Sequence, residues 1–301
     1  MNNALIIGYG SIGQLHFKIL KKLKIFDKIY LFTSQKIKSK DKIHSLNRLN
    51  NLNIQYVVIA SPTSMHKQHL LKINNQLKNK KILVEKPLFN SLMDKNLKLN
   101  NDIYVGYDLR YHPVISKLKN IVKNQKIWTA NVFCGSYLPN WRAKRDYTKT
   151  SSAIKKLGGG VLNDLSHEFD YLNWIFGNIK VLYSFNKKIS NLKINTDDIV
   201  ISINKHKKGL ISNVVLNYYT RPAQRKLIID GEKISISADI IKNEINYFYN
   251  NKLHKSKFKN IKREFTHYLM HKDIIFSAKP ICCNYIEAIE VQKILNKIKL
   301  K

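Results

Sequence analysis

The sequence predicts an α/β protein in two parts: an N-terminal doubly wound parallel sheet, and a C-terminal α/β domain with a large, mostly antiparallel open sheet. In the first part, short apolar strand segments alternate with amphipathic helical segments, starting with residues 4–7. After about residue 112, most segments are strand-like, and short turns join several of them. Alternation predicts parallel strands with right-handed crossovers, whereas consecutive strands with short turns predict antiparallel pairing.

The length and composition set the broad class. A chain of 301 residues suits two domains, which we place at 1–112 and 113–301. A hydrophobic fraction of 44% excludes wholesale disorder. No signal-peptide pattern precedes Ala4, and no uncharged run approaches the ~20 residues of a membrane helix. The three cysteines form no CxxC pair, so we expect a reduced, cytoplasmic protein without a disulfide framework, a metal site or a membrane partner.

The net charge of +33 raises the question of nucleic-acid binding. The lysines are spread through nearly every segment, and only seven of the 53 basic residues are arginine. This distribution favours solvated lysine faces and no nucleic-acid partner. The positive field would still steer anionic cofactors and substrates toward the protein.

The N-terminal elements follow from hydrophobic periodicity. We expect strands at 4–7, 28–32, 56–60, 81–84 and 103–107. Between them we expect helices from Gly13, around 43–49, near 65–77 and from Ser91.

The C-terminal elements begin with a helix at 113–123. We then expect strands at 128–134, 180–186, 198–204, 210–219, 225–230 and 233–238, a glycine-initiated helix at 160–176 and a last helix at 285–298. The asparagine- and lysine-rich patches have the composition of loops.

The glycine-rich loop Gly8-Tyr9-Gly10-Ser11-Ile12-Gly13 follows the first strand and opens a helix. Gly8 allows a tight turn, Gly10 lets a pyrophosphate reach the backbone, and Gly13 lets the helix and strand pack closely. This context predicts a dinucleotide site formed by Gly8, Gly10, Ser11, Ile12 and Gly13. A glycine turn without a ligand is the alternative.

The choice between NAD and NADP depends on the end of the second strand. The acidic residue that would pair with a ribose 2′-hydroxyl is missing, and Thr33, Ser34 and Lys36 stand there instead. Hydroxyls and lysines tolerate or bind a 2′-phosphate, so the sequence favours NADP over NAD.

A polar segment leaves the third strand where a bound dinucleotide would lie. Ser61, Pro62 and Thr63 are candidate cofactor contacts, and His66 is a candidate on the nicotinamide side. For Thr63 and His66, a helix N-cap and turn is the equally plausible structural alternative.

Glu85-Lys86-Pro87 follows the fourth strand directly, at the sheet edge where open α/β sheets bind ligands. Both Glu85 and Lys86 are candidate cofactor contacts. Lys86 could also donate a hydrogen bond to a reacting oxygen or carry its proton. Taken alone, Lys86 would be read as a surface lysine.

The segment Gly158–Asp170 carries the third candidate group. A glycine run that opens a helix would let another molecule approach the backbone. Asp164 and His167 stand three residues apart, which would place both on one helical face. Together with Lys86, they suit proton transfer coupled to hydride transfer. A buried core histidine is the alternative for His167.

These motifs resemble, in order and spacing, the Gfo/Idh/MocA oxidoreductases, named for glucose-fructose oxidoreductase and inositol dehydrogenase. The matching segments are Gly8–Gly13, Ala60–His66, Glu85–Pro87, Gly106–Pro113 and Gly158–Asp170. The resemblance implies a Rossmann domain, a tightly held nicotinamide cofactor and hydride exchange with a sugar or cyclitol carbon. It also implies a C-terminal sheet that supports homo-oligomers, with Lys86, Asp164 and His167 as catalytic residues.

One departure from the family pattern affects the acid. Many members place the aspartate four residues before the histidine, whereas Asp164 precedes His167 by three. Aligned on His167, the expected aspartate position holds Asn163, which is therefore a candidate substrate contact. The role of Asp164 is less secure than that of His167.

The segment 137–147 carries the substrate signal. Trp141 and Tyr147 can stack on a sugar face, and Arg142 and Arg145 can bind a carboxylate or phosphate in a bidentate manner. A similar segment occurs in family members of bacterial surface-sugar biosynthesis, which implies an acidic or nucleotide-linked sugar. Arginines paired with acidic side chains are the alternative. Lesser candidates for substrate binding are Arg110 and His112.

The leading hypothesis is therefore an NAD(P)-dependent sugar oxidoreductase. An NAD-dependent glycosidase of related fold would cleave a glycosidic bond without net redox change. A non-catalytic dinucleotide-binding or nucleic-acid-associated protein would bind its ligand without hydride exchange.

Overall fold

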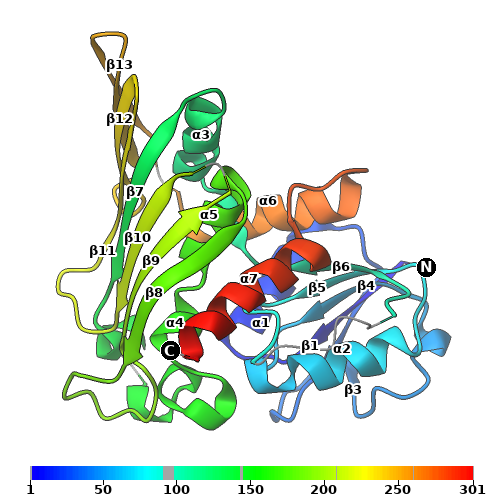
Figure 1. The fold of residues 1–301 in the computed structure, drawn as a ribbon. Helices are drawn as coiled ribbons and strands as arrows, with labels where there is room; N and C mark the ends of the chain where they lie inside the picture. Colours follow the sequence, from blue (N-terminus) through cyan, green and yellow to red (C-terminus); the bar gives the residue numbers. More distant parts are fainter. Residues whose placement is uncertain (1, 91–97, 143–144, 208, 260, 301) are drawn as a thin grey trace. The chain divides into compact units, whose positions relative to one another are not determined.

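The chain folds into two compact units. The computed structural model describes residues 2–90, 98–142, 145–207, 209–259 and 261–300 (Figure 1). The first unit comprises Met1–Asp108 and Lys262–Ile289, and the second comprises Leu109–Ile261 and Glu290–Lys301. The expected division at residue 112 therefore needs correction, because the chain changes unit at residue 108 and a C-terminal segment returns to the first unit.

The first unit is built on a seven-stranded sheet in the order β15-β6-β5-β4-β1-β2-β3. Its strands are β1 (Asn3–Ile7), β2 (Lys28–Phe32), β3 (Lys42–Ile43), β4 (Ile54–Ile59), β5 (Lys81–Val84), β6 (Asp102–Val105) and β15 (Cys283–Asn284). All pairs are parallel except β15 with β6. The predicted doubly wound parallel sheet is confirmed, and the returning segment adds an antiparallel edge strand.

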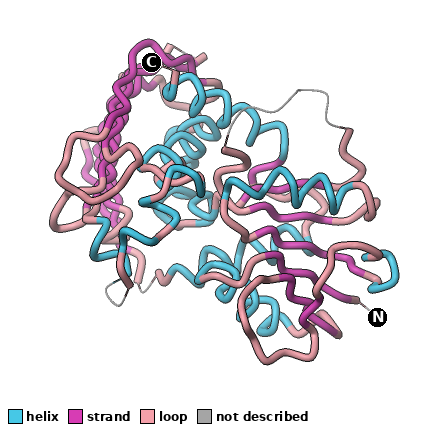
Figure 2. The backbone as a smooth tube through the Cα atoms, turned by 90° about the horizontal axis from the view of Figure 1, so that it is seen from below, coloured by secondary structure: helices cyan, strands magenta, loops and turns pink. Residues whose placement is uncertain are grey.

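The helices of the first unit lie beside the strands of its sheet (Figure 2). They are α1 (Ser11–Leu23), α2 (His66–Asn74), α6 (Arg263–Phe276) and the first part of α7 (Tyr285–Lys299), with the 3₁₀ turns η1 (Leu49–Leu52) and η2 (Thr63–Met65). The helix expected around 43–49 is wrong, because Arg48 adopts a positive φ of 59° and interrupts helical geometry. The helix expected from Ser91 lies outside the described residues.

The second unit contains an eight-stranded sheet in the order β14-β13-β12-β11-β7-β10-β9-β8. Its strands are β7 (Ile127–Gly135), β8 (Ile179–Lys187), β9 (Ile199–His206), β10 (Ile211–Asn217), β11 (Gln224–Gly231), β12 (Ile234–Asp239), β13 (Glu244–Tyr249) and β14 (Lys252–Lys257). All pairs are antiparallel except β10 with β7, so the predicted mostly antiparallel sheet is confirmed.

The hairpin of β13 and β14 occupies a segment whose composition predicts a loop. Tyr249 pairs with Lys252, which leaves Asn250 and Asn251 as a two-residue turn. Both asparagines have positive φ, at 48° and 56°. Asparagine tolerates this conformation, and two such residues make the tight turn that matches the twist of a hairpin.

The helices of the second unit lie along one face of its sheet (Figure 1). They are α3 (Pro113–Val122), α4 (Val161–Asp164) and α5 (His167–Phe176), with 3₁₀ turns η3 (Asp108–Tyr111), η4 (Leu138–Arg142), η5 (Tyr147–Lys149), η6 (Ser151–Ala153) and η7 (Lys155–Leu157). The expected continuous helix at 160–176 is broken at Leu165, where φ is −104° and ψ is 27°. Among the described residues, no helix combines the length and apolar character needed to cross a membrane.

Candidate active site

The three glycines of the first loop have different environments. Gly8 has φ of +93°, and a Cβ there would lie 2.6 Å from the carbonyl oxygen of Ala60. A Cβ on Gly13 would lie 2.1 Å from the carbonyl oxygen of Gly8. Around Gly10, by contrast, no atom of the described residues beyond its neighbours in the chain lies within 4 Å of a Cβ built on it. Gly8 and Gly13 therefore serve packing, while Gly10 keeps its approach open.

Gly10 is also the N-cap of α1, with φ of −66°. Ser11 is exposed and Ile12 is half-buried at the start of the helix, and the first turn carries no acidic side chain. A helix N-terminus presents unpaired N–H groups and a positive partial charge to an anion. The loop therefore fits the diphosphate of a dinucleotide.

The carboxyl end of β2 carries no acidic side chain at Thr33 or Ser34. Thr33 is half-buried, and its Oγ1 accepts a hydrogen bond from the backbone N–H of Gln35 at 3.2 Å. Ser34 is exposed. A pocket follows in the chain, lined by Lys36, Ile37, Lys38, Ser39, Lys40, Lys42 and His44. Four lysines around one hollow suit a phosphate group.

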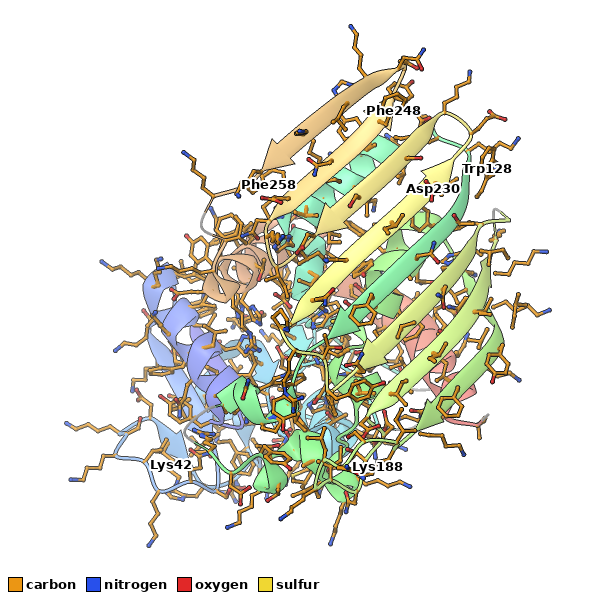
Figure 3. All side chains as sticks on the ribbon, turned by 90° about the vertical axis from the view of Figure 1, so that its left-hand side faces the viewer. Lys42, Trp128, Lys188, Asp230, Phe248 and Phe258 are labelled. Carbon is orange, nitrogen blue, oxygen red and sulfur yellow. The ribbon has the colours of Figure 1, made fainter. Side chains whose placement is uncertain are left out.

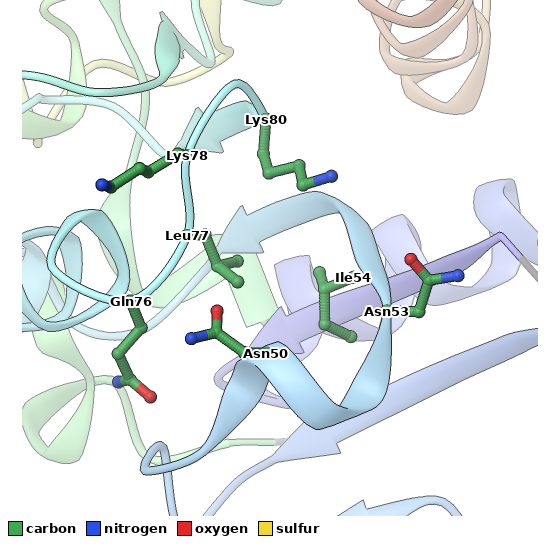
Figure 4. A pocket seen from close by; sticks show the side chains of 7 residues that line it. All are labelled: Asn50, Asn53, Ile54, Gln76, Leu77, Lys78 and Lys80. Carbon is green, nitrogen blue, oxygen red and sulfur yellow. The ribbon is translucent and has the colours of Figure 1, made fainter.

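A second pocket of the first unit lies at the opposite edge of the sheet. It is lined by Asn50, Asn53, Ile54, Gln76, Leu77, Lys78 and Lys80 (Figure 4). These residues stand at or before the first residues of β4 and β5. They therefore lie at the amino ends of the strands, opposite the edge where such sheets bind their ligands.

The loop after β4 brings the next candidates to the carboxyl edge. Pro62 is exposed and Thr63 is half-buried. The hydroxyl of Ser61 lies 2.9 Å from Nδ1 of His69. These positions leave Pro62 and Thr63 accessible, while the hydroxyl of Ser61 already has a protein partner.

The surroundings of His66 differ from those expected of a residue that contacts the cofactor. Its side chain is buried, with Nε2 2.9 Å from the carbonyl oxygen of Ser61 and Nδ1 3.0 Å from that of Pro87. His66 thus ties the loop after β4 to the loop after β5. Because its ring nitrogens face backbone carbonyls, the imidazole positions these loops and is not a direct cofactor contact.

Glu85 and Lys86 leave β5 side by side, but only Lys86 is half-exposed. The carboxylate of Glu85 is buried, and its Oε1 lies 2.9 Å from Nε2 of His16. Burial alone would raise the pKa of Glu85, but the hydrogen bond from His16, with charged groups nearby, lowers it to about 2. Glu85 is therefore a buried anion bound to His16, and not the cofactor contact that we expected.

Asp164 and His167 belong to different helices in the second unit. Asp164 is the last residue of α4, and His167 is the first residue of α5. The expectation that both project from one continuous helical face is wrong, because Leu165 and Ser166 form a turn. Both side chains are half-buried.

The glycine run before α4 also has a different role from the expected one. Gly160 has φ of +119°, and a Cβ there would lie 2.2 Å from Oδ1 of Asp197. Oδ2 of Asp197 accepts a hydrogen bond from the backbone N–H of Leu162 at 2.9 Å. The space is filled by the protein's own carboxylate, which caps α4 at its start, so the glycine does not admit a ligand.

Tyr218 connects two of the expected site residues. Its hydroxyl donates to Oδ2 of Asp164 at 2.6 Å, and its ring packs edge-on against Trp141 at 5.3 Å between centroids. Burial and the charge of Asp164 raise the pKa of Tyr218 well above its ordinary value. The phenol therefore stays protonated and fixes the orientation of Asp164.

The segment 137–147 offers charged and aromatic groups at the surface. Trp141 is 37% exposed, and its Nε1 donates to the hydroxyl of Ser136 at 2.7 Å. Arg142 and Arg145 are exposed. Tyr147 is half-buried, and its hydroxyl accepts from the backbone N–H of Lys193 at 3.1 Å.

Three of the substrate candidates are inside the second unit. Arg110 is 1% exposed, and its guanidinium binds both carboxylate oxygens of Asp170, with Nη2 2.7 Å from Oδ1. His112 is buried and caps α3, with Nδ1 accepting from the N–H of Val114. Asn163 is also buried and donates to the carbonyl of Gly158. These contacts make Arg110, His112 and Asn163 structural residues, so we remove them from the substrate-binding set.

Sequence reasoning missed several residues that shape the candidate site. They are His16, Tyr56, Asp197, Tyr218 and His271. His16 shares the buried face of α1 with Ile19 and Leu20, so its spacing could have marked it as an inward-pointing polar residue. The others act across long sequence separations, for which the chain gives no local signal. Among the described residues, no group of three or more His, Cys, Asp or Glu is arranged to hold a metal ion.

Comparisons with known proteins identify the family of this chain. Residues 2–97 match the model of the GFO/IDH/MocA oxidoreductase family with an NAD-binding Rossmann fold, and residues 115–237 match the GFO/IDH/MocA C-terminal domain. The chain is 30% identical over 132 residues to the uncharacterized oxidoreductase YrbE of Bacillus subtilis (strain 168). That match covers 42% of this chain and 36% of YrbE, so it spans well under two thirds of that relative's length.

Solved structures share the fold over the whole chain. Levoglucosan dehydrogenase in complex with NADH and levoglucosan superposes with a TM-score of 0.83 at 15% identity, covering 100% of this chain and 97% of that one. The WlbA dehydrogenase of Bordetella pertussis, in complex with NADH and UDP-GlcNAcA, gives a TM-score of 0.76 at 15% identity, covering 99% and 95%. At these identities the likeness establishes the fold alone.

Proposed function

Because this chain belongs to the GFO/IDH/MocA oxidoreductase family, we propose that it is an NAD(P)-dependent dehydrogenase or reductase acting on a sugar or sugar-derivative carbon. When bound, the nicotinamide supplies or accepts the hydride. The observation that carries the proposal is the open approach to Gly10 at the start of α1. Lys86 stands at the carboxyl edge of the same sheet, after β5.

The chain's own residues handle the proton of the reacting oxygen. Lys86 donates a hydrogen bond to that oxygen, which is the role that an ammonium suits. His167 accepts the proton, since imidazole titrates near neutral pH. Asp164, held by the Tyr218 hydroxyl at 2.6 Å, orients the substrate.

Substitution of these groups tests the proposal. Lys86→Ala and His167→Ala each lower kcat by roughly 10²- to 10⁴-fold in a nicotinamide absorbance assay, while the Kd of the cofactor stays near the wild-type value. Lys67→Ala, at an exposed position on α2, and His254→Ala, on β14, are matched controls. Near-wild-type turnover in both test variants would contradict the assignment. Release of a leaving group without accumulation of reduced cofactor would select a glycosidase instead.

The substrate we propose is an acidic or nucleotide-linked sugar used in bacterial surface-carbohydrate biosynthesis in the cytoplasm. Support comes from the exposed Arg142 and Arg145 beside Trp141, and from the UDP-GlcNAcA in the WlbA structure. Arginine binds carboxylate and phosphate through paired donors. Arg142→Ala and Arg145→Ala therefore raise KM for a nucleotide sugar more than for the corresponding free sugar. Equal effects on both would remove these arginines from anion recognition.

We further propose that NADP is preferred over NAD. The pocket lined by Lys36, Lys38, Lys40 and Lys42 follows Thr33 and Ser34, where a carboxylate would otherwise repel a 2′-phosphate. Lys38→Glu combined with Lys40→Glu weakens binding of NADP⁺ but not of NAD⁺ in calorimetric titrations. Parallel losses for both cofactors, or tighter binding of NAD⁺ by the wild type, would contradict the preference.

We propose that the face of the eight-stranded sheet opposite α3, α4 and α5 pairs with a second copy of the chain (Figure 1). Figure 3 looks onto this face, where Trp128 and Phe248 are 52% and 48% exposed. Ile228, which is 53% exposed, pairs with Ser237, two residues from the Ser235 that pairs with Phe248, so it shares the face of Phe248. An extended apolar patch on an exposed face favours association with another molecule. Ile228→Glu lowers the mass measured by light scattering, whereas Ile286→Glu, at an exposed position on α7, leaves it unchanged. A monomeric wild type would contradict the proposal.

A further inference from the structure

A chain of four polar side chains runs through the core of the first unit and ends on Glu85. The hydroxyl of Tyr56 lies 2.9 Å from Nδ1 of His271. Nε2 of His271 lies 2.8 Å from Nδ1 of His16, and Nε2 of His16 lies 2.9 Å from Oε1 of Glu85. Tyr56 is 2% exposed, Glu85 is 8% exposed, and both histidines are fully buried. They come from β4, α6, α1 and the loop after β5, so the fold brings them together from distant parts of the sequence.

The hydrogen-bond roles in this chain follow from one ionised carboxylate. An ionised Glu85 only accepts, so Nε2 of His16 carries its proton and donates. A neutral His16 then accepts at Nδ1 from Nε2–H of His271, and a neutral His271 accepts at Nδ1 from the Tyr56 hydroxyl. Every proton points along the chain toward Glu85, and each ring nitrogen has one defined role.

The charges around the chain favour this arrangement. Burial lowers the pKa of His16, and burial with the neighbouring His16 and His267 lowers the pKa of His271, so both rings are neutral at pH 7 and above. Burial raises the pKa of Tyr56 well above its ordinary value, so the phenol keeps its proton. The other groups that act on the chain electrostatically are Lys86 after β5, Arg263 and His267 on α6, and Cys282 and Tyr104 at the edge of the sheet.

We propose that Tyr56, His271 and His16 are positioning residues that hold Glu85 as a fixed buried anion, and that this anion keeps the neighbouring Lys86 ammonium charged as a hydrogen-bond donor. The inference rests on the proposed role of Lys86 and adds the residues that set its charge. A carboxylate near an amine favours the protonated form of that amine, and the effect is stronger where water is excluded. Glu85 is held because Nε2 of His16 donates a hydrogen bond to its Oε1 and Gly106 leaves room for the carboxylate.

The chain of Tyr56, His271, His16 and Glu85 costs more desolvation free energy than apolar packing would. Two imidazoles and a carboxylate in a core each carry a desolvation penalty that apolar side chains of similar volume would avoid. A packing role would be served equally well by such side chains. A charge-setting role requires the hydrogen-bonded anion.

The experiment measures how readily Lys86 reacts with an amine-directed acylating reagent, using peptide mass spectrometry across a pH series. The reagent attacks the neutral amine, so the rate reports the charge of Lys86 without any turnover. In Glu85→Gln and His16→Leu, Lys86 is acylated about 10-fold faster at a given pH, which corresponds to about one pH unit. His16→Gln retains an amide donor toward Glu85 and restores slow labelling. Lys18, on the surface of α1, serves as the internal reference.

Activity supplies the second measurement. In the same two variants, the alkaline limb of kcat/KM moves to lower pH, while cofactor affinity changes less than twofold. His206→Gln, in the second unit, replaces another buried histidine and controls for loss of stability. Wild-type labelling of Lys86 in folded Glu85→Gln and His16→Leu would overturn the inference. If the wild type shows no hydride transfer, the function proposal fails, whereas the labelling result still decides the inference.

Discussion

The carboxylate of Glu85 occupies the space that a side chain on Gly106 would need. A Cβ at position 106 would lie 2.8 Å from Oε1 of Glu85. That oxygen cannot retreat without breaking its hydrogen bond to His16. The glycine after β6 is therefore part of the same arrangement that fixes Glu85.

Gly106→Ala should accordingly destabilise the first unit by about 1–3 kcal/mol, as overpacking in a core does. The free energy of unfolding is measured in urea. Gly10→Ala is the control, because no described atom beyond its neighbours in the chain lies within 4 Å of the new Cβ. Equal stability of the two variants would show that Glu85 is free to move.

The buried ion pair of Arg110 and Asp170 gives a prediction for the second unit. Asp170→Asn removes the counter-charge of a guanidinium that is 1% exposed. We expect a loss of about 3–5 kcal/mol in the free energy of unfolding, because the guanidinium stays buried after losing this carboxylate. Cofactor affinity should not change in the fraction that remains folded. A stable variant with a raised substrate KM would instead return Arg110 to the substrate-binding set.

Acid should destabilise the protein well above the pKa range of its carboxylates. Burial lowers the pKa values of His16, His66 and His271, and it lowers that of His206 to about 4. A base with a lower pKa in the folded state stabilises the fold fully above the unfolded pKa of ~6.5, and this stability is lost as pH falls toward the folded pKa. Each histidine contributes up to about 1.4 kcal/mol per pH unit in that window.

Urea denaturation at pH 7.5 and 5.5 measures this loss. His206→Gln should flatten the dependence, since one titrating group is removed. A free energy of unfolding that is the same at both pH values would show that these histidines are accessible to protons in the folded state.

The turn of β13 and β14 can be tested by substitution. Asn251→Gly should keep or slightly raise stability, because glycine adopts positive φ without steric cost. Asn250→Val should lower the free energy of unfolding by about 1–2 kcal/mol, because a β-branched residue is strained there. Thermal unfolding of the two variants provides the comparison, and identical midpoints would contradict the turn geometry.

The sequence predicted the elements whose signal is local. The apolar run at 4–7 and the glycine loop specify β1 and the start of α1, and the alternation of segments specifies the parallel sheet. The sequence did not predict the hairpin at 244–257, because asparagine and lysine dominate its composition. Asn250-Asn251 is nevertheless itself a turn signal.

The candidate site was less accessible from the sequence because its arrangement depends on distant contacts. Asp197 takes the space beside Gly160, so a glycine run with the appearance of a ligand loop is a capping device. The spacing of Asp164 and His167 indicated one helix, but the turn at Leu165 separates them. Arg110 had the chemistry of a substrate contact, and only its pairing with Asp170 shows that it is structural.

Calorimetric titration of NADP⁺ and NAD⁺ into the wild type and Gly10→Ala tests the cofactor site most directly. Gly10 has φ of −66° and open space around its Cβ position, so the alanine variant should unfold at the wild-type temperature. Its methyl group would nevertheless occupy the approach of a diphosphate to the backbone. We expect the variant to bind dinucleotide at least about 10-fold more weakly, a difference of about 1.4 kcal/mol. Equal affinity in the two proteins, or no binding by the wild type, would contradict the assignment of this loop as the cofactor site.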